Sequence, residues 1–483
     1  MSNKSFFSRF LSSLTVNRVT RIDVLLLASN IVIGSLFDID CSAGYWTLLT
    51  NTIMIGIGYI LLSVSLAEMS SALPFSGGIY GIARAFLHPF VGFYVCIFEL
   101  MINLFYISLA VRSLSLLFVH ASVVPDNSLQ LLFYLLFYAI ILSLCLLGGK
   151  FFWWTNGILG ITCLVLSVIY ILGAIPRADF SSWKHTEQPF TFKQVMMSLP
   201  NPSLTYLGIQ YLPLNSKFTQ DPKNDVPFVM IVTVTIIFAL SLSMITAAYS
   251  QSPGYDVLST SDYPLIYGFA KIFSISHSHA NFLGIPFLFS TNFTFFYCLG
   301  KQASSMASSG LLPKLLVTEL PILKTPYIAL ISVTIICFVL NIFLFYYEEE
   351  LLLRYAFICC LSTYIVFICF FVAYIQFARN YTSLQRSVRS PFGVVGAVVG
   401  VLIFLLCGIS VVAFQSEGYV ELVFLALVSV LVIVVYVWVL GAQEFSEEEK
   451  NELFKAYLIT ANRAAKDRVL RRNRRNQNKY RLA

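Results

Sequence analysis

Charged side chains are scarce in this sequence: Asp, Glu, Lys and Arg together make up 11% of its 483 residues. A soluble globular domain carries about 25% charged residues, so this chain cannot cover a water-exposed surface of ordinary size. Apolar residues reach 58%, and the mean hydropathy is +0.80. The shortage of charge excludes a soluble fold and makes lipid the expected solvent.

The sequence also lacks the patterns of common enzyme and metal sites. No Cys-x-x-Cys pair occurs among the ten cysteines, the five histidines are scattered, and no nucleophile elbow or phosphate-binding loop is present. These absences argue against an enzyme, a metal centre and a resident cofactor. We expect the cysteines to be buried packing residues. Most of the net charge of +7 lies near the C-terminus, where it indicates membrane topology rather than nucleic-acid binding.

Twelve apolar segments are long enough to cross a bilayer, which takes about 20 residues in a helix. They predict an all-α membrane protein with spans at 22–41, 47–70, 89–119, 129–148, 152–175, 195–214, 227–249, 278–303, 326–346, 354–377, 391–413 and 419–441. With both termini on one side, that side holds 25 of the 31 Lys and Arg residues, and the other side holds 5. The asymmetry predicts cytoplasmic N- and C-termini.

Polar segments flank this membrane domain at 22–441. Residues 1–21 combine Ser, Lys and Arg with an apolar helical face, which favours a cytoplasmic amphipathic segment over an organellar presequence. Residues 442–483 run from acidic to strongly basic, and the basic end could bind anionic lipid or a protein partner, as could the N-terminal segment. The plasma membrane is the expected location; an organellar membrane, including the mitochondrial one, stays open.

Two spans differ from plain hydrophobic helices. The first carries Ser29-Asn30 and Gly34-Ser35 in its middle, and the sixth carries Pro200-Asn201-Pro202, Gly208 and Pro213. They begin two successive five-span blocks, 22–175 and 195–377, which the last two spans at 391–441 follow. Interruptions at matching places in two halves are typical of inverted-repeat transporters. Unpaired backbone groups at such breaks can bind a carboxylate, an amine or an ion; ordinary kinks are the alternative.

Short motifs in the connecting segments carry a family resemblance. Residues 67–80 read Ala-Glu, then Pro, then Gly-Gly-x-Tyr, from the end of the second span onward. This run resembles the loop after the second helix in the amino acid–polyamine–organocation (APC) superfamily. Further runs resemble that family in the same order: 221–227 (Asp-Pro-Lys to Pro), 261–265, 301–313 (Lys-Gln to Gly-Leu-Leu-Pro), 324–327 and 386–393. Taken together, these motifs are most similar to those of the ethanolamine-permease-like and the basic amino-acid or polyamine members of the superfamily.

The resemblance implies a LeuT-type fold, in which five-helix inverted repeats with broken helices 1 and 6 hold substrate between helices 1, 3, 6 and 8. It implies a symporter or antiporter that moves a small amine or amino acid by alternating access. The chain departs from the family pattern at three places: Ser35-Leu36 follow Gly34 without a second glycine, Tyr211 lies near the usual helix-six glycine, and Lys217-Phe218 replace an acidic pair. The alternative is therefore a transport-inactive APC-fold protein that serves as a structural or sensory subunit.

Glu99 is the sharpest candidate for a functional residue. It lies about ten residues into the third span, near mid-bilayer, where an ionisable group is costly and marks a functional site by default. Asn103 and Tyr106 share its helical face. Glu99 could contact a substrate ammonium or carry a proton; a structural glutamate that joins helices is the alternative.

The remaining candidates come from the breaks and from the resemblance. Substrate contacts are predicted for Glu99 and Asn103 and, at the breaks, for Ser29, Asn30, Gly34, Ser35, Tyr206, Gly208, Gln210 and Tyr211. Ser290 and Thr291 could complete a sodium shell, and Glu68 is expected to shape the inner gate. Span 152–175 has no lysine, which removes the built-in cation of some proton-coupled relatives. Coupling is thus expected to use sodium, or a proton at Glu99.

Overall fold

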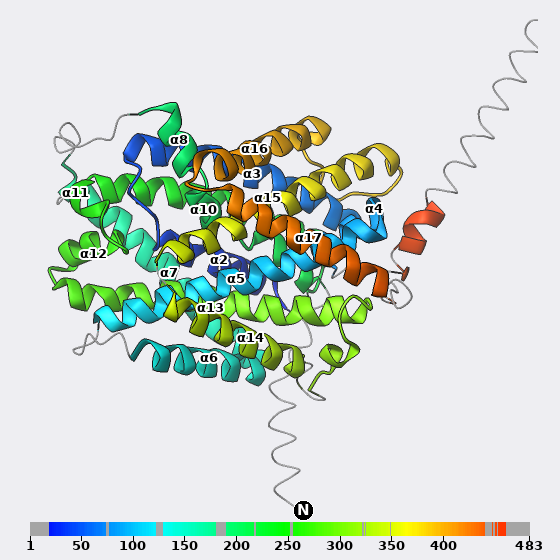
Figure 1. Cartoon of the computed structure of the whole chain (residues 1–483), viewed down its shortest axis with the longest axis horizontal. Coiled ribbons are helices and arrows are strands. Elements are labelled where there is room, and N and C mark those ends of the chain that lie inside the picture. The colour runs from blue at the N-terminus through cyan, green and yellow to red at the C-terminus, as the bar shows by residue number, and fades with distance from the viewer. Residues whose placement is uncertain are drawn as a thin grey trace, which may run out of the picture.

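The computed structural model describes residues 19–439, except 74–76, 122–128, 180–189, 217–218, 252–254, 321–322, 324 and 348, together with 447, 450–451 and 453–459. The predicted N-terminal segment up to residue 18, Lys217-Phe218 and most of the predicted tail lie outside this part. The described residues form helices and one isolated bridge between Val19 and Thr219. Figure 1 shows the long helices running roughly along one direction, side by side in a single bundle.

Ten helices in the described part of the chain are long and apolar enough to cross a membrane. They coincide with ten of the twelve segments predicted from hydropathy. They are α3 (Tyr45–Ala72), α5 (Pro89–Ala121), α6 (Gln130–Leu147), α7 (Gly149–Ala174), α10 (Pro222–Tyr249), α13 (His277–Ser308), α14 (Tyr327–Tyr346), α15 (Glu349–Asn380), α16 (Gly393–Phe414) and α17 (Tyr419–Val439).

The two remaining segments are the interrupted ones, and both are divided into short helices. The first consists of α2 (Arg21–Ile33) and the 3₁₀ turn η1 (Gly34–Leu36). The second consists of α8 (Phe192–Ser198), α9 (Asn201–Thr205) and the 3₁₀ helix η5 (Ile209–Asn215). Gly208 separates α9 from η5 with a φ of 115°, which a residue with a side chain adopts only with strain.

Shorter helices connect the long ones: α4 (Gly78–Phe86), η3 (Ile175–Arg177), α11 (Tyr255–Leu258), α12 (Leu265–Phe273) and η6 (Lys314–Val317). Gly78 has a φ of 59° at the start of α4. This fits the sharp turn that the Gly-Gly pair predicts, although residues 74–76 of that motif lie outside the described part.

Burial divides the bundle into a centre and a periphery. Helix α2 is almost wholly buried from Leu27 to Ile33, and α3 and α13 bury most of their length. Helix α17 buries 17% of its most apolar stretch, so its surface is left for lipid. Figure 1 shows α2 and α5 in the middle of the view, α6 at its lower edge, α16 at its upper edge and α17 in front of the bundle. The central helices therefore position any internal site.

Candidate functional site

A cavity of about 290 Å³ lies at one end of the bundle centre. Its wall comes from both interrupted segments, through η1 and α9, and from α3, α5, α10, α13 and α15. Leu109, Ile245, Leu353 and Phe357 belong to its apolar lining. The polar part of the wall includes Ser35, Asp38, Asp40, Asn201 and Thr205.

Thr291 on α13 determines the local geometry of the first interrupted segment. Its hydroxyl donates to the carbonyl oxygen of Asn30 at 2.8 Å and accepts the N–H of Gly34 at 2.9 Å. These two backbone groups stand four residues apart and would bond each other in an uninterrupted α-helix. The hydroxyl is thus inserted into the helix, where it replaces a backbone hydrogen bond.

Gly34 lets α13 come this close to the first segment. A Cβ atom at Gly34 would lie 2.1 Å from the Thr291 Oγ1 and 2.4 Å from the Phe287 carbonyl oxygen. Real Cβ atoms do not approach other atoms this closely, so the close contact requires glycine. Ser290, the other predicted sodium ligand, donates to the Phe287 carbonyl oxygen at 2.9 Å. Both hydroxyls are therefore engaged with backbone groups.

The other residues predicted in the first segment divide between the cavity and the helix packing. Ser35 lines the cavity, and its hydroxyl pairs with the Tyr106 hydroxyl at 2.9 Å. Asn30 faces α7 instead, where its amide donates to the main chain and the side chain of Asn156 at 2.7 and 2.8 Å. Ser29 bonds back to the Leu25 carbonyl oxygen. Gly34 and Ser35 thus belong to the cavity wall, and Ser29 and Asn30 to the packing.

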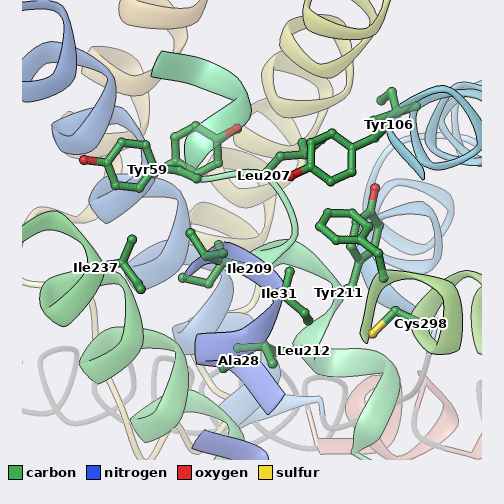
Figure 2. Close-up of a cluster of buried hydrophobic side chains, with 14 of the residues drawn as sticks. Ala28, Ile31, Tyr59, Tyr106, Leu207, Ile209, Tyr211, Leu212, Ile237 and Cys298 are labelled. Atoms are coloured by element: carbon green, nitrogen blue, oxygen red, sulfur yellow. The ribbon is translucent and has the colours of Figure 1, made fainter. Parts of the chain in front are cut away.

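The predicted residues of the second interrupted segment lie in a packed layer outside the cavity wall. The hydroxyl of Tyr206 pairs with that of Ser241 at 2.7 Å, and the N–H of Gly208 donates to the Gln210 side chain at 2.9 Å. Tyr211 is 2% exposed, and its hydroxyl has no hydrogen-bond partner in the described part of the chain. Figure 2 shows this layer, in which Ile31 of α2 lies among Ile209, Tyr211 and Leu212 of η5.

Glu99 belongs to a buried polar group in the middle of the bundle. It is 2% exposed, and its carboxylate accepts a hydrogen bond from the Gln302 amide of α13 at 3.2 Å. Asn103 donates to the carbonyl oxygen of the same Gln302 side chain. Among the described residues, no Lys or Arg forms an ion pair with Glu99. The cavity wall does not include Glu99, although Tyr106, two turns further along α5, belongs to it.

Glu68 lies towards the opposite end of α3 from the cavity. Its carboxylate accepts hydrogen bonds from the Arg386 guanidinium, from the Tyr374 hydroxyl at 2.5 Å and from the Ser390 main chain at 3.0 Å. The Arg386 guanidinium also lies over the Phe377 ring, 4.4 Å from its centroid. Glu68 therefore joins α3 to the end of α15 and to the segment before α16.

Two carboxylates at the cavity mouth have no counterpart among the sequence-predicted residues. Asp38 accepts a hydrogen bond from Ser113 of α5 at 3.1 Å; Asp40 accepts from the Ser42 main chain and from the Asn201 amide. Both lie between η1 and α3, beyond the helical part of the first segment. The signal for them was the Asp-x-Asp pair at the end of the first predicted span, 22–41, in a sequence with few acids.

The side chains of Asp38 and Asp40 are exposed at the cavity mouth, whereas Glu68 and Glu99 are buried among the helices.

Comparison with known proteins gives one match. A family model described as amino acid permease matches residues 11–438. No curated protein matches the chain.

Proposed function

Because the chain belongs to the amino acid permease family of the APC superfamily, we propose that it is a secondary active transporter that carries a small amine or amino acid across a membrane by alternating access. The chain is an integral, multi-pass membrane protein of a transporter family and not an enzyme. The observation that carries the proposal is the cavity, because both interrupted segments contribute to its wall.

The two interrupted segments support a twelve-span, LeuT-type arrangement with inverted repeats. Each begins a block of five apolar segments, and the two approach each other closely at Gly208, where a Cβ atom would lie 1.9 Å from the Ile31 side chain. In this arrangement α2–η1 and α8–α9–η5 act as spans 1 and 6. Broken helices at the interface of two repeats are where transporters of this kind bind their substrates.

The contacts at the two ends of the bundle support a state that is open on one side. The cavity reaches the end of the bundle that carries Asp38 and Asp40. The other end is held together by Glu68 with Arg386 and by the ion pair between Arg21 and Asp225 at 2.7 Å. Positive residues gather at that second end, so we assign it to the cytoplasm. Transport then requires the acidic end to close and these ion pairs to separate.

We assign ion coupling to a proton at Glu99. Glu99 has no Lys or Arg ion-pair partner among the described residues, and a lone carboxylate costs several kcal/mol in the membrane interior, which favours proton binding there. Gln302 and Asn103 are placed to sense its protonation through their hydrogen bonds. Sodium at Ser290 and Thr291 is the competing assignment, but both hydroxyls would first have to leave their backbone partners.

A second function is favoured by the packing below the cavity. Leu36 and Tyr211, which replace two glycines of the family pattern, are both fully buried, and the cavity does not reach Glu99. These side chains fill space that a carrier would keep for substrate. They support the alternative of a transport-inactive subunit of a membrane assembly.

Uptake into liposomes tests the two functions directly. Purified protein would be supplied with labelled ethanolamine, choline, polyamines, and neutral and basic amino acids under imposed proton or sodium gradients. Saturable uptake driven by a proton gradient, and lost in Glu99→Gln, is the expected result. The exposed Asp256→Asn of α11 is the matched control, which should retain uptake. Absence of uptake by well-folded protein would shift the function to the structural alternative.

A further inference from the structure

We propose that the cavity binds an organic cation that lacks a carboxylate, with its ammonium group at Asp38 and Asp40 and a second polar group at Thr205. This inference rests on the proposed transport function and narrows its substrate class. The site is expected to bind an amine in preference to the amino acid with the same carbon skeleton.

The charges in the cavity wall favour a cation. Asp38 and Asp40 are its charged residues, and none of the lining residues is Lys, Arg or His. Asp38 accepts a hydrogen bond from Ser113 through one carboxylate oxygen, and among the described residues the other oxygen has no donor and is left for a ligand. An ammonium group is therefore attracted to this end of the cavity, and a carboxylate is repelled.

The main chain at the first interruption does not compensate a ligand carboxylate. Helical transporter breaks can bind a carboxylate through free N–H groups. Here the backbone stays in the right-handed helical region at Ile33, Gly34 and Phe37. The Gly34 N–H is occupied by the Thr291 hydroxyl, and the Phe37 N–H by the Gly34 carbonyl oxygen. A carboxylate beside η1 would thus meet two aspartates and would find the N–H groups of Gly34 and Phe37 occupied.

Thr205 gives independent evidence for a polar ligand. It lines the cavity and is 8% exposed, yet its hydroxyl takes part in none of the hydrogen bonds in the described part of the chain. A polar side chain buried to this degree normally has a partner. In the cavity that partner would be the ligand, to which the hydroxyl can donate or from which it can accept.

The size and the lining of the cavity limit the ligand to a small amine. Its volume is about 290 Å³, and side chains such as Leu109, Ile245 and Phe357 provide apolar contact for the ligand body. Aliphatic or aromatic monoamines, diamines and amino alcohols fit these features, because each combines a cationic head with a compact apolar part.

Matched pairs of an amine and its parent amino acid test the inference. We would measure binding to the purified full chain, and uptake into liposomes, for ethanolamine and serine, cadaverine and lysine, agmatine and arginine, and tyramine and tyrosine. In at least one pair we expect the amine to have a Kd at least tenfold lower than the amino acid. Asp38→Asn should raise that Kd tenfold or more. Thr205→Val should raise the Kd several-fold for amines with a second polar group, and Asp256→Asn should leave it unchanged.

Each outcome separates this inference from the proposed function. Equal or tighter binding of the amino acid in every pair would overturn the exclusion of the carboxylate, while its uptake would leave the transport function intact. Binding of an amine without uptake would support the cation site and contradict transport. If no compound binds to protein that keeps its thermal unfolding transition, both proposals fail. Retention of amine affinity in Asp38→Asn would overturn the role of that residue.

Discussion

Replacing Thr291 by valine should destabilise the protein far more than its small chemical change suggests. Valine has nearly the shape of threonine but lacks the hydroxyl that bridges the Asn30 carbonyl oxygen and the Gly34 N–H. A buried backbone group without a partner costs about 1–3 kcal/mol, so two groups should cost about 2–6 kcal/mol. The loss falls below this range if the first segment straightens and the two groups bond each other.

The assay is unfolding of the purified protein in detergent micelles by guanidinium, with the free energy compared between variants. Thr363→Val on α15 is the matched control. Thr363 is 2% exposed, as Thr291 is, but its hydroxyl donates to the Cys359 carbonyl oxygen of its own helix. That carbonyl keeps its helical N–H partner after substitution, so the control should lose about 1 kcal/mol or less. Thr291→Ser should stay close to the wild type, because it keeps the hydroxyl.

Equal losses in Thr291→Val and Thr363→Val would refute the reasoning, since they would show that the bridge contributes no more than an ordinary hydroxyl. A loss in Thr291→Ser as large as in Thr291→Val would also contradict it. That result would assign the effect to the methyl group and its packing rather than to the hydrogen bonds.

Two further predictions concern other parts of the bundle. Glu68→Gln should lower the free energy of unfolding by about 3–5 kcal/mol, because it leaves the Arg386 charge buried without its partner. Denaturant unfolding measures this loss, and the double variant with Arg386→Met should recover most of it. Gly208→Ala should reduce the yield of folded protein in size-exclusion chromatography, because φ is 115° there and the added Cβ atom would lie 1.9 Å from a neighbour. Gly408→Ala is the control and should keep the yield, because its added Cβ atom would lie 3.7 Å from the nearest neighbour.

Hydropathy predicts the helices of this protein well, because the bilayer imposes one simple requirement on length and polarity. Ten predicted segments coincide with ten long helices, and the two segments chosen for their Gly and Pro residues are the two that the structure divides. Gly208 shows why this works: positive φ at a buried site needs glycine, so the sequence itself marks the break.

The candidate site is less accessible to sequence reasoning, because a polar residue does not reveal which neighbour it bonds. Asn30 and Tyr206 lie in interrupted segments as expected, but they bond Asn156 and Ser241 on other helices. Thr205 has the same chemistry as many threonines that bond their own helix. That its hydroxyl has no hydrogen-bond partner among the described residues is visible only in three dimensions. The roles of Glu99, Asn103 and the other predicted residues stay predictions.

The contact between Gly208 and Ile31 has a mechanical consequence. With no side chain at one of the two positions, the interrupted segments touch at a distance that leaves no slack between them. A tilt of α2 must then push η5 in the same direction, since packed interiors transmit displacement rather than absorb it. In the proposed transport cycle, α2 and η5 would therefore move together, and the part of the cavity wall that η1 forms would move with them.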